Sequence, residues 1–112
     1  MTATYDFIIP QGSTTARIFC LKDCKGLPVN LTGYIAKLTI RPRYGSKCVT
    51  DELTSEQTPD RMQINPKTAE IRCFWPAALT TDLPTGRFFY VLELTSADGY
   101  VFRACSGLVT ID

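Results

Sequence analysis

The chain has 112 residues, of which 45% are hydrophobic and 21% charged, and its formal net charge is +1. This length favours one domain with a self-sufficient core. A charge so close to zero supplies no long-range field for phosphates or anionic lipid, so we expect neither a nucleic-acid nor a membrane partner. The chain contains no histidine. Because this removes the commonest general base and metal ligand, we expect a non-enzymatic protein with no cofactor and no metal site.

The first predicted element is a strand within MTATYDFIIPQG, where Tyr5, Phe7 and Ile9 alternate and Pro10 ends the run. This segment has no basic region, and its apolar stretch is too short for a signal peptide. No apolar run in the sequence approaches the roughly 18 residues of a membrane-spanning helix. We therefore expect synthesis in the cytoplasm.

Two further strands follow, with a turn between them. STTARIFCLK, residues 13–22, is rich in β-branched and aromatic residues, and DCKG follows with Gly26 where a tight hairpin needs a positive φ. LTGYIAKLTI is the clearest half-buried strand of the chain. Its apolar face is predicted to hold Tyr34, Ala36, Leu38 and Ile40.

The second half of the chain also alternates predicted strands with turns. Residues 42–60 are polar and predict a long loop with one edge strand near 49–53, and the short strand RMQI leads into a turn at Asn65-Pro66. AEIRCFW alternates next, and PAALTTDLPTG (76–86) is the one plausible helical piece, of one or two turns. RFFYVLELT and YVFRACSGLVTID are the last strands, with a turn ending at Gly99 and an expected bulge or bend at Gly107.

About seven strands, frequent turn signals and hardly any helix predict an all-β fold. The architecture that fits best is a single domain over residues 1–112, an antiparallel β-sandwich of immunoglobulin-like type. A small β-barrel is the alternative.

The five cysteines are scattered and contain no CxxC pair, which disfavours a zinc site. Cys73 lies on an alternating apolar face and predicts a small buried hydrophobe, and Cys20 is also expected to pack. Cys24 lies in a predicted turn and Cys48 in a polar loop, so both are expected to be exposed thiols. The alternative is an intermolecular disulfide within an assembly, because an odd number of cysteines cannot all pair within one chain. For Cys105, packing and pairing stay open.

Three other patterns have structural explanations that we prefer to functional ones. RPRYGSK (41–47) could contact phosphates, but a solvated loop fits a chain of near-zero charge better. Asp51, Glu52 and Glu56 are acidic but lack calcium-loop spacing. Trp75 could be a sugar platform, but a core tryptophan is more typical of a sandwich.

Several motifs, taken in order, resemble a family of small bacteriophage structural proteins and tail or baseplate domains. YDFIIPQGST and DCKGLPVNLTGYIAKLTIR are similar to its Y-D-F-x-I-x-Q-G and G-x-P-[VI]-[DN]-L-T-G-Y segments, although Val91 stands where the family often has aspartate. The later segments resemble its T-x-x-L-P-x-G, Y-x-L-E-L and D-G-x-V-x-R motifs, and the match leaves out only the variable loop at 43–62. The resemblance implies scaffold positions, none of them catalytic, at Gly26, Pro28, Leu31, Thr32, Gly33, Tyr34, Arg41, Gly86, Tyr90, Gly99, Arg103 and Gly107.

The resemblance implies a non-enzymatic virion structural protein in a bacteriophage tail, baseplate or neck, or on the head surface. Its partners would be other virion proteins and copies of itself, and we expect edge strands and the loop at 42–60 to make the contacts. One alternative is a capsid decoration (cement) protein. Another is a host-surface or glycan-binding adhesion module, which predicts an exposed aromatic cluster.

Overall fold

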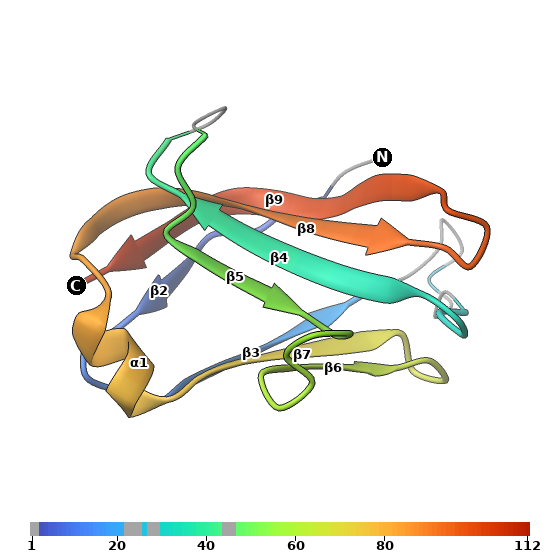
Figure 1. Ribbon diagram of the computed structural model, residues 1–112, viewed down its shortest axis with the longest axis horizontal. Coiled ribbons are helices and arrows are strands. Elements are labelled where there is room, and N and C mark those ends of the chain that lie inside the picture. Colours follow the sequence, from blue (N-terminus) through green and yellow to red (C-terminus); the bar gives the residue numbers. More distant parts are fainter. Residues whose placement is uncertain (1–2, 22–25, 27–29, 44–46) are drawn as a thin grey trace.

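The computed structural model describes residues 3–21, 26, 30–43 and 47–112, which form two packed sheets and one short helix (Figure 1). In chain order the elements are β1 (Ala3–Thr4), β2 (Phe7–Ile9), β3 (Thr15–Cys20), β4 (Ile35–Arg41), β5 (Asp51–Thr54), β6 (Met62–Asn65), β7 (Glu70–Trp75), α1 (Ala77–Asp82), β8 (Gly86–Thr95) and β9 (Val101–Ile111).

The sheet topology is that of an immunoglobulin-like sandwich. The larger sheet has the order β1-β9-β8-β4-β5, with β2 also paired to β9, and the smaller sheet has the order β3-β7-β6. These correspond to the G-F-C-C′ and B-E-D strands of immunoglobulin domains. The predicted β-sandwich is therefore confirmed, and because the two sheets are separate the alternative of a small barrel is wrong.

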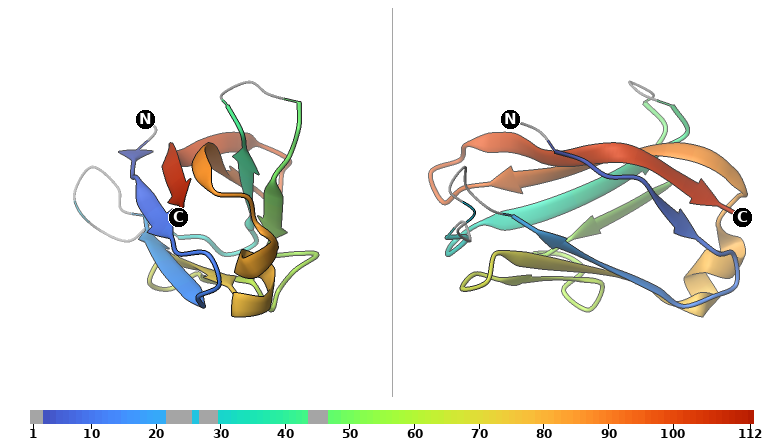
Figure 2. Two further views of the ribbon diagram at one scale, coloured as in Figure 1. Left: turned by 90° about the vertical axis from the view of Figure 1, so that its left-hand side faces the viewer. Right: turned by 180° about the vertical axis from the view of Figure 1, so that it is seen from behind.

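The N-terminal edge departs from the predicted antiparallel arrangement. β1 and β2 both pair with β9 in parallel, with Ala3 opposite Cys105 and Phe7 opposite Val109. The predicted first strand is thus two short strands, separated at residues 5 and 6. Figure 2 shows these strands running down the side of the sandwich toward β3. The prediction failed here because alternation identifies a strand but not its partner.

The core follows the predicted two-residue period. Ala36, Leu38 and Ile40 of β4 are fully buried, and Trp75 is a core residue as predicted. Each large apolar side chain that is buried contributes about 1.5–3 kcal/mol of transfer free energy. β8, beside β4 in the larger sheet, adds Phe88, Tyr90, Leu92 and Leu94 to this buried face. β7 of the smaller sheet supplies Ile71 and Cys73 from the opposite side.

Aromatic rings join the two sheets. The ring of Phe7 lies 5.0 Å from that of Tyr90, 5.6 Å from Trp75 and 6.2 Å from Phe19, measured between centroids. In antibody domains the B and F strands are linked by a disulfide. Here the corresponding strands β3 and β8 are linked by a ring contact of 5.9 Å between Phe19 and Tyr90.

The single helix closes one end of the sandwich. α1 connects β7 to β8, as the sequence predicted for residues 76–86, and it lies at the left end of the molecule in Figure 1. Its buried Thr80 donates a hydrogen bond of 2.8 Å to the Ser13 carbonyl and so ties the helix to the start of β3. None of the helical structure in the described residues has the length and apolar character to span a bilayer.

Candidate functional site

The polar side chains buried inside the sandwich are used in hydrogen bonds that stabilise the fold. Every buried side-chain nitrogen and oxygen in the described part of the chain has a hydrogen-bond partner. In that same part, no three cysteine, aspartate or glutamate side chains gather closely enough to hold a metal ion. The polar contacts concentrate instead in two networks.

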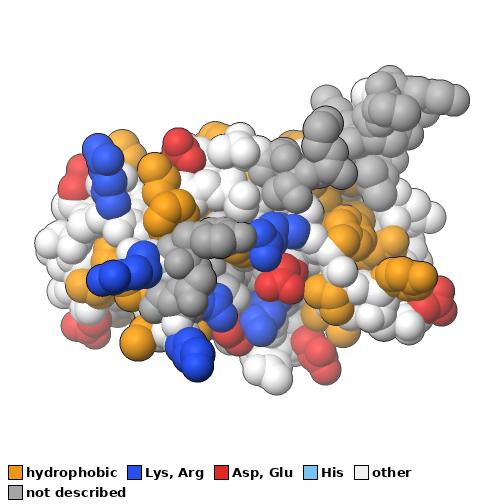
Figure 3. All heavy atoms as spheres, turned by 90° about the horizontal axis from the view of Figure 1, so that it is seen from above, with side chains coloured by type: hydrophobic (Ala, Val, Ile, Leu, Met, Phe, Trp, Pro, Cys, Tyr) orange, Lys and Arg blue, Asp and Glu red, His pale blue; other side chains and the backbone are white. Residues whose placement is uncertain are grey.

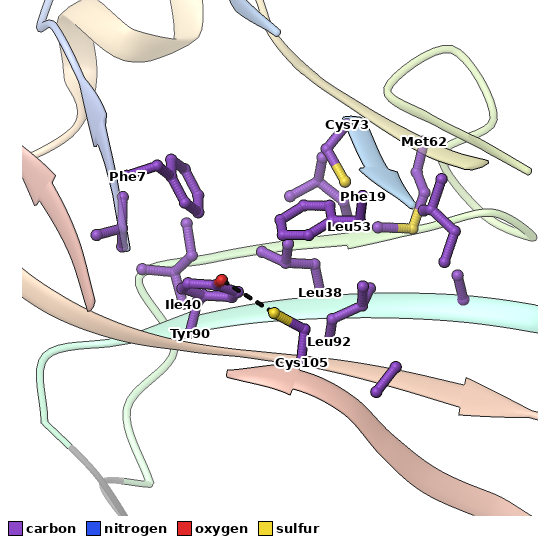
Figure 4. Close-up of a cluster of buried hydrophobic side chains, with 14 of the residues drawn as sticks. Phe7, Phe19, Leu38, Ile40, Leu53, Met62, Cys73, Tyr90, Leu92 and Cys105 are labelled. Atoms are coloured by element: carbon purple, nitrogen blue, oxygen red, sulfur yellow. Dashed lines mark hydrogen bonds between the residues drawn. The ribbon is translucent and has the colours of Figure 1, made fainter. Parts of the chain in front are cut away.

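The first network holds the N-terminal segment against β9. The Tyr90 hydroxyl donates to the Tyr5 carbonyl and also lies 3.3 Å from the Cys105 sulfur, a contact visible in Figure 4. The Asp6 carboxylate accepts a hydrogen bond of 2.8 Å from the Leu108 amide. Burial and the Cys105 contact raise the pKa of Tyr90, so its hydroxyl stays protonated and able to donate.

Gly107 lies on β9 beside the break between β1 and β2, where residues 5 and 6 come close to it. A Cβ atom there would overlap the Tyr5 carbonyl and lie 2.7 Å from the Asp6 carboxylate. Of the bulge or bend expected at Gly107, the bulge is wrong, because Gly107 stays in register with Tyr90 and the irregularity falls between Leu92 and Glu93. The bend stays a prediction. A glycine in a strand can mark a bulge or a close backbone approach, and here it marks the approach.

The second network joins β5 to the smaller sheet. Asp51 accepts hydrogen bonds from the Arg61 guanidinium at 2.8 and 3.3 Å and from the Trp75 indole at 2.9 Å. Only 10% of the Asp51 side chain and 15% of the Arg61 side chain are exposed. Asp51 was expected to be a loop acid, because nothing local in the sequence indicates a guanidinium ten residues away and an indole twenty-four residues away.

The structure separates the cysteines into two groups. Cys73 and Cys105 are buried, which confirms packing for Cys73 and resolves Cys105 in favour of packing, and burial raises the pKa of Cys73 to about 12. Cys20 was expected to pack but is exposed, because it takes the outward position after the buried Phe19. Cys48 is exposed and Cys24 lies outside the described residues. That either thiol forms an intermolecular disulfide within an assembly stays a prediction.

The residues that the resemblance marks as scaffold are spread over the fold. Leu31 is buried and Tyr34 packs against the core, while Pro28 lies outside the described residues. Thr32 donates to the Asn30 side chain in a local turn, and Arg41 and Arg103 lie on β4 and β9. Positive φ angles, which glycine adopts without strain, occur at Gly26, Gly33, Gly86 and Gly99.

The surface offers apolar side chains and shallow hollows as possible contact sites. One hollow, of about 500 Å³, lies on the outer face of the smaller sheet. The exposed large hydrophobic side chains are Tyr5, Ile8, Ile18, Ile35, Val49, Phe89, Tyr100, Val101 and Phe102. Five of them belong to strands of the larger sheet: Ile8, Ile35, Phe89, Val101 and Phe102. Tyr100 lies in the turn between β8 and β9, directly before Val101.

Comparison with known proteins gives no family. No family model matches the chain, and no curated protein matches it. Solved structures do match, and one of them is Drosophila OTK, extracellular domains 3-5, with a TM-score of 0.41 and 12% sequence identity. The alignment covers 95% of this chain and 32% of that chain, so this chain spans about a third of that structure.

Proposed function

We propose that the protein is a non-enzymatic structural component of a bacteriophage virion, synthesised in the host cytoplasm and assembled through its surfaces. The observation that carries this proposal is the first polar network. It brings together the Y-D-F opening, the Y-x-L-E-L strand and the glycine of the final strand, which are three separate parts of the family pattern, at Tyr5, Tyr90 and Gly107. Contact between distant motifs supports the view that the pattern describes one fold.

Side-chain faces are better suited to the assembly contacts than strand edges. β5 is an edge strand of four residues, and its Glu52 forms an exposed ion pair of 3.7 Å with Lys37. Short, charged edges discourage strand addition. Figure 3 shows the molecule from above, with hydrophobic side chains interspersed among positive and negative ones over that face. Mixed surfaces of this kind are typical of contacts between proteins that fold separately.

Mass spectrometry of purified particles tests this function. Particles produced by the strain that carries the gene would be separated into heads and tails, and the protein quantified in each. We expect a fixed copy number in one fraction, and the fraction distinguishes a tail, baseplate or neck location from the head surface, where a capsid decoration role would lie. Absence from both fractions would reject the proposal.

A host-surface or glycan-binding module is the second candidate, because the structure has an exposed aromatic cluster. Tyr100 is 77% exposed and Phe102 44% exposed, and the Phe102 ring meets that of Tyr34 edge-on at 6.1 Å. Binding of the purified domain to host cell envelopes, lost on Tyr100→Ala, would favour this candidate. Equal binding of the wild-type domain and the Tyr100→Ala variant to the envelopes would reject this candidate.

A further inference from the structure

The turn between β8 and β9 presents an exposed tyrosine on a rigid support. The Ser96 amide donates to the Tyr100 carbonyl at 2.8 Å, the Gly99 amide to the Ser96 carbonyl at 3.0 Å, and the Tyr100 amide to the Ser96 hydroxyl at 3.1 Å. Tyr100 is 77% exposed and the following Val101 is 58% exposed. Exposed aromatic side chains on ordered backbone lose little entropy when a partner binds them.

An acidic side chain accompanies the tyrosine. Asp98 is exposed at the same turn, and no ion pair joins it to another of the described residues. Asp98, Tyr100 and Val101 together are called the hairpin knob below. The knob therefore combines one aromatic ring, one aliphatic side chain and one carboxylate.

The hollow on the outer face of the smaller sheet has the complementary composition. Its volume is about 500 Å³, within the roughly 300–1,000 Å³ of typical binding pockets. Its lining residues are Ile18, Gln63, Ile64, Asn65, Pro66, Glu70 and Arg72. Ile18 is 48% exposed although it lies on a strand, which leaves an aliphatic surface open to a partner.

Arg72 is the cation of this hollow. It lies on the central strand β7, in register with Ile18 on one side and Gln63 on the other. The described residues offer it no side-chain hydrogen bond or ion pair, whereas Arg61, nearby on the same side of the molecule, is bound by Asp51. Glu70, the acid of the hollow, already accepts a hydrogen bond of 2.7 Å from the Thr68 hydroxyl.

We propose that the hairpin knob of one copy of this protein seats in the hollow of the next copy. The Asp98 carboxylate pairs with the Arg72 guanidinium, and the Tyr100 ring packs on Ile18. The side-chain amides of Gln63 and Asn65 are the partners available to the tyrosine hydroxyl. Tyrosine and arginine are the residue types that most often dominate the binding energy of an interface.

This inference rests on the proposed virion role and specifies how neighbouring copies would contact each other. The knob and the hollow are different surfaces, so the contact is heterologous and repeats from copy to copy until a ring closes or a filament grows. A knob of three residues is a small interface, and small interfaces are weak singly. Ring closure or attachment to a larger particle raises the effective concentration and makes such contacts persistent.

Sedimentation equilibrium of the purified full chain, under reducing conditions that exclude disulfides, tests the contact. We expect self-association with a dissociation constant between about 10 μM and 1 mM, which corresponds to roughly 4–7 kcal/mol. Asp98→Arg and Arg72→Asp should each weaken association at least about tenfold, and the two together should restore it by exchanging the charges. Tyr100→Ala should weaken it similarly. Ile8→Ala, an exposed position on the other sheet, is the matched control and should change nothing.

Two results would overturn the inference: a wild-type chain that stays monomeric throughout this range, or a charge exchange that fails to restore association. Cross-linking of purified particles separates this failure from failure of the proposed function. If the particles contain the protein but residues 98–101 never cross-link to residues 63–72 of a neighbouring copy, only the knob contact is wrong. If the protein is absent from particles yet self-associates with the expected variant pattern, only the virion role is wrong.

Discussion

At the scale of single residues, Gly107 determines whether the N-terminal segment can lie against β9. Since a methyl group there would overlap the Tyr5 carbonyl, Gly107→Ala forces the backbone or the segment to move. Overpacking of this kind typically costs about 1–3 kcal/mol. We expect the urea midpoint to fall accordingly, and amide hydrogen exchange to accelerate in β1 and β2 more than in β4.

The neighbouring substitution Ser106→Ala is the control for this prediction. Ser106 is half-buried on the same strand, and its replacement removes an oxygen without adding volume. We expect a change within about 0.5 kcal/mol, as for surface positions generally. Equal destabilisation by both variants would show that the close approach to Tyr5 does not limit the stability of the fold.

Asp51 is the second residue on which stability depends. Asp51→Asn keeps an acceptor for the Trp75 indole but leaves the mostly buried Arg61 guanidinium without its counter-charge. Loss of one partner of a buried ion pair costs about 3–5 kcal/mol. Glu52→Gln is the matched control, because its pair with Lys37 is largely exposed and is expected to contribute less than about 1 kcal/mol. Urea unfolding of both variants measures the difference, and similar midpoints would contradict the role of Asp51.

At the scale of elements, β2 shows how adjacent positions of one short strand differ. Phe7 is 5% exposed and packs against three other aromatic rings of the core, whereas Ile8 is 49% exposed. Phe7→Ala should therefore destabilise by about 3–5 kcal/mol, and Ile8→Ala by less than about 0.5 kcal/mol. Thermal unfolding followed by near-ultraviolet circular dichroism measures both. Comparable losses would mean that β2 does not hold the orientation described here.

Strand identity was predictable from sequence because the core is built on alternation. The faces of β4 and β7 and the short helix at 77–82 follow from residue type and spacing alone. Strand pairing was not predictable in the same way. The parallel contact of β1 and β2 with β9 joins the two ends of the chain, and its signals are one glycine, one tyrosine hydroxyl and one carboxylate that are ordinary in isolation.

The candidate contact surfaces were predictable only in part. An exposed aromatic cluster was expected only for an adhesion module, and the turn at residues 96–99 was predictable from its glycine. The exposure of Tyr100 was not, because it depends on where β9 begins. The hollow around Arg72 was missed. It arises because β3, β7 and β6 place their outward side chains side by side, which requires the register of three strands.

At the scale of the whole molecule, two weakly acidic groups of the core, the Cys73 thiol and the Tyr90 hydroxyl, link stability to pH. Burial raises the pKa of Cys73 from 9.0 to about 12, with nearby Arg61 opposing the shift, and it raises the pKa of Tyr90 in the same direction. Between about pH 9 and pH 12 the Cys73 thiol stays neutral in the folded chain but ionises in the unfolded chain, and Tyr90 behaves in the same way above about pH 10. Since the unfolded state then binds fewer protons, the free energy of unfolding falls as pH rises.

For Cys73 this loss begins near pH 9 and continues to about pH 12. Each such group contributes about 1.4 kcal/mol per pH unit within its window. We therefore expect the free energy of unfolding, measured in urea with a reductant present, to fall less steeply between pH 8 and pH 10.5 in Cys73→Ala than in the wild type. The slopes are compared rather than the absolute values, because the substitution also leaves a small cavity. Cys20→Ala, at an exposed thiol, should keep the wild-type slope. A Cys73→Ala slope equal to that of the wild type would mean that the thiol ionises without opening the space between the two sheets, and the sandwich would then be more permeable to water than its packing indicates.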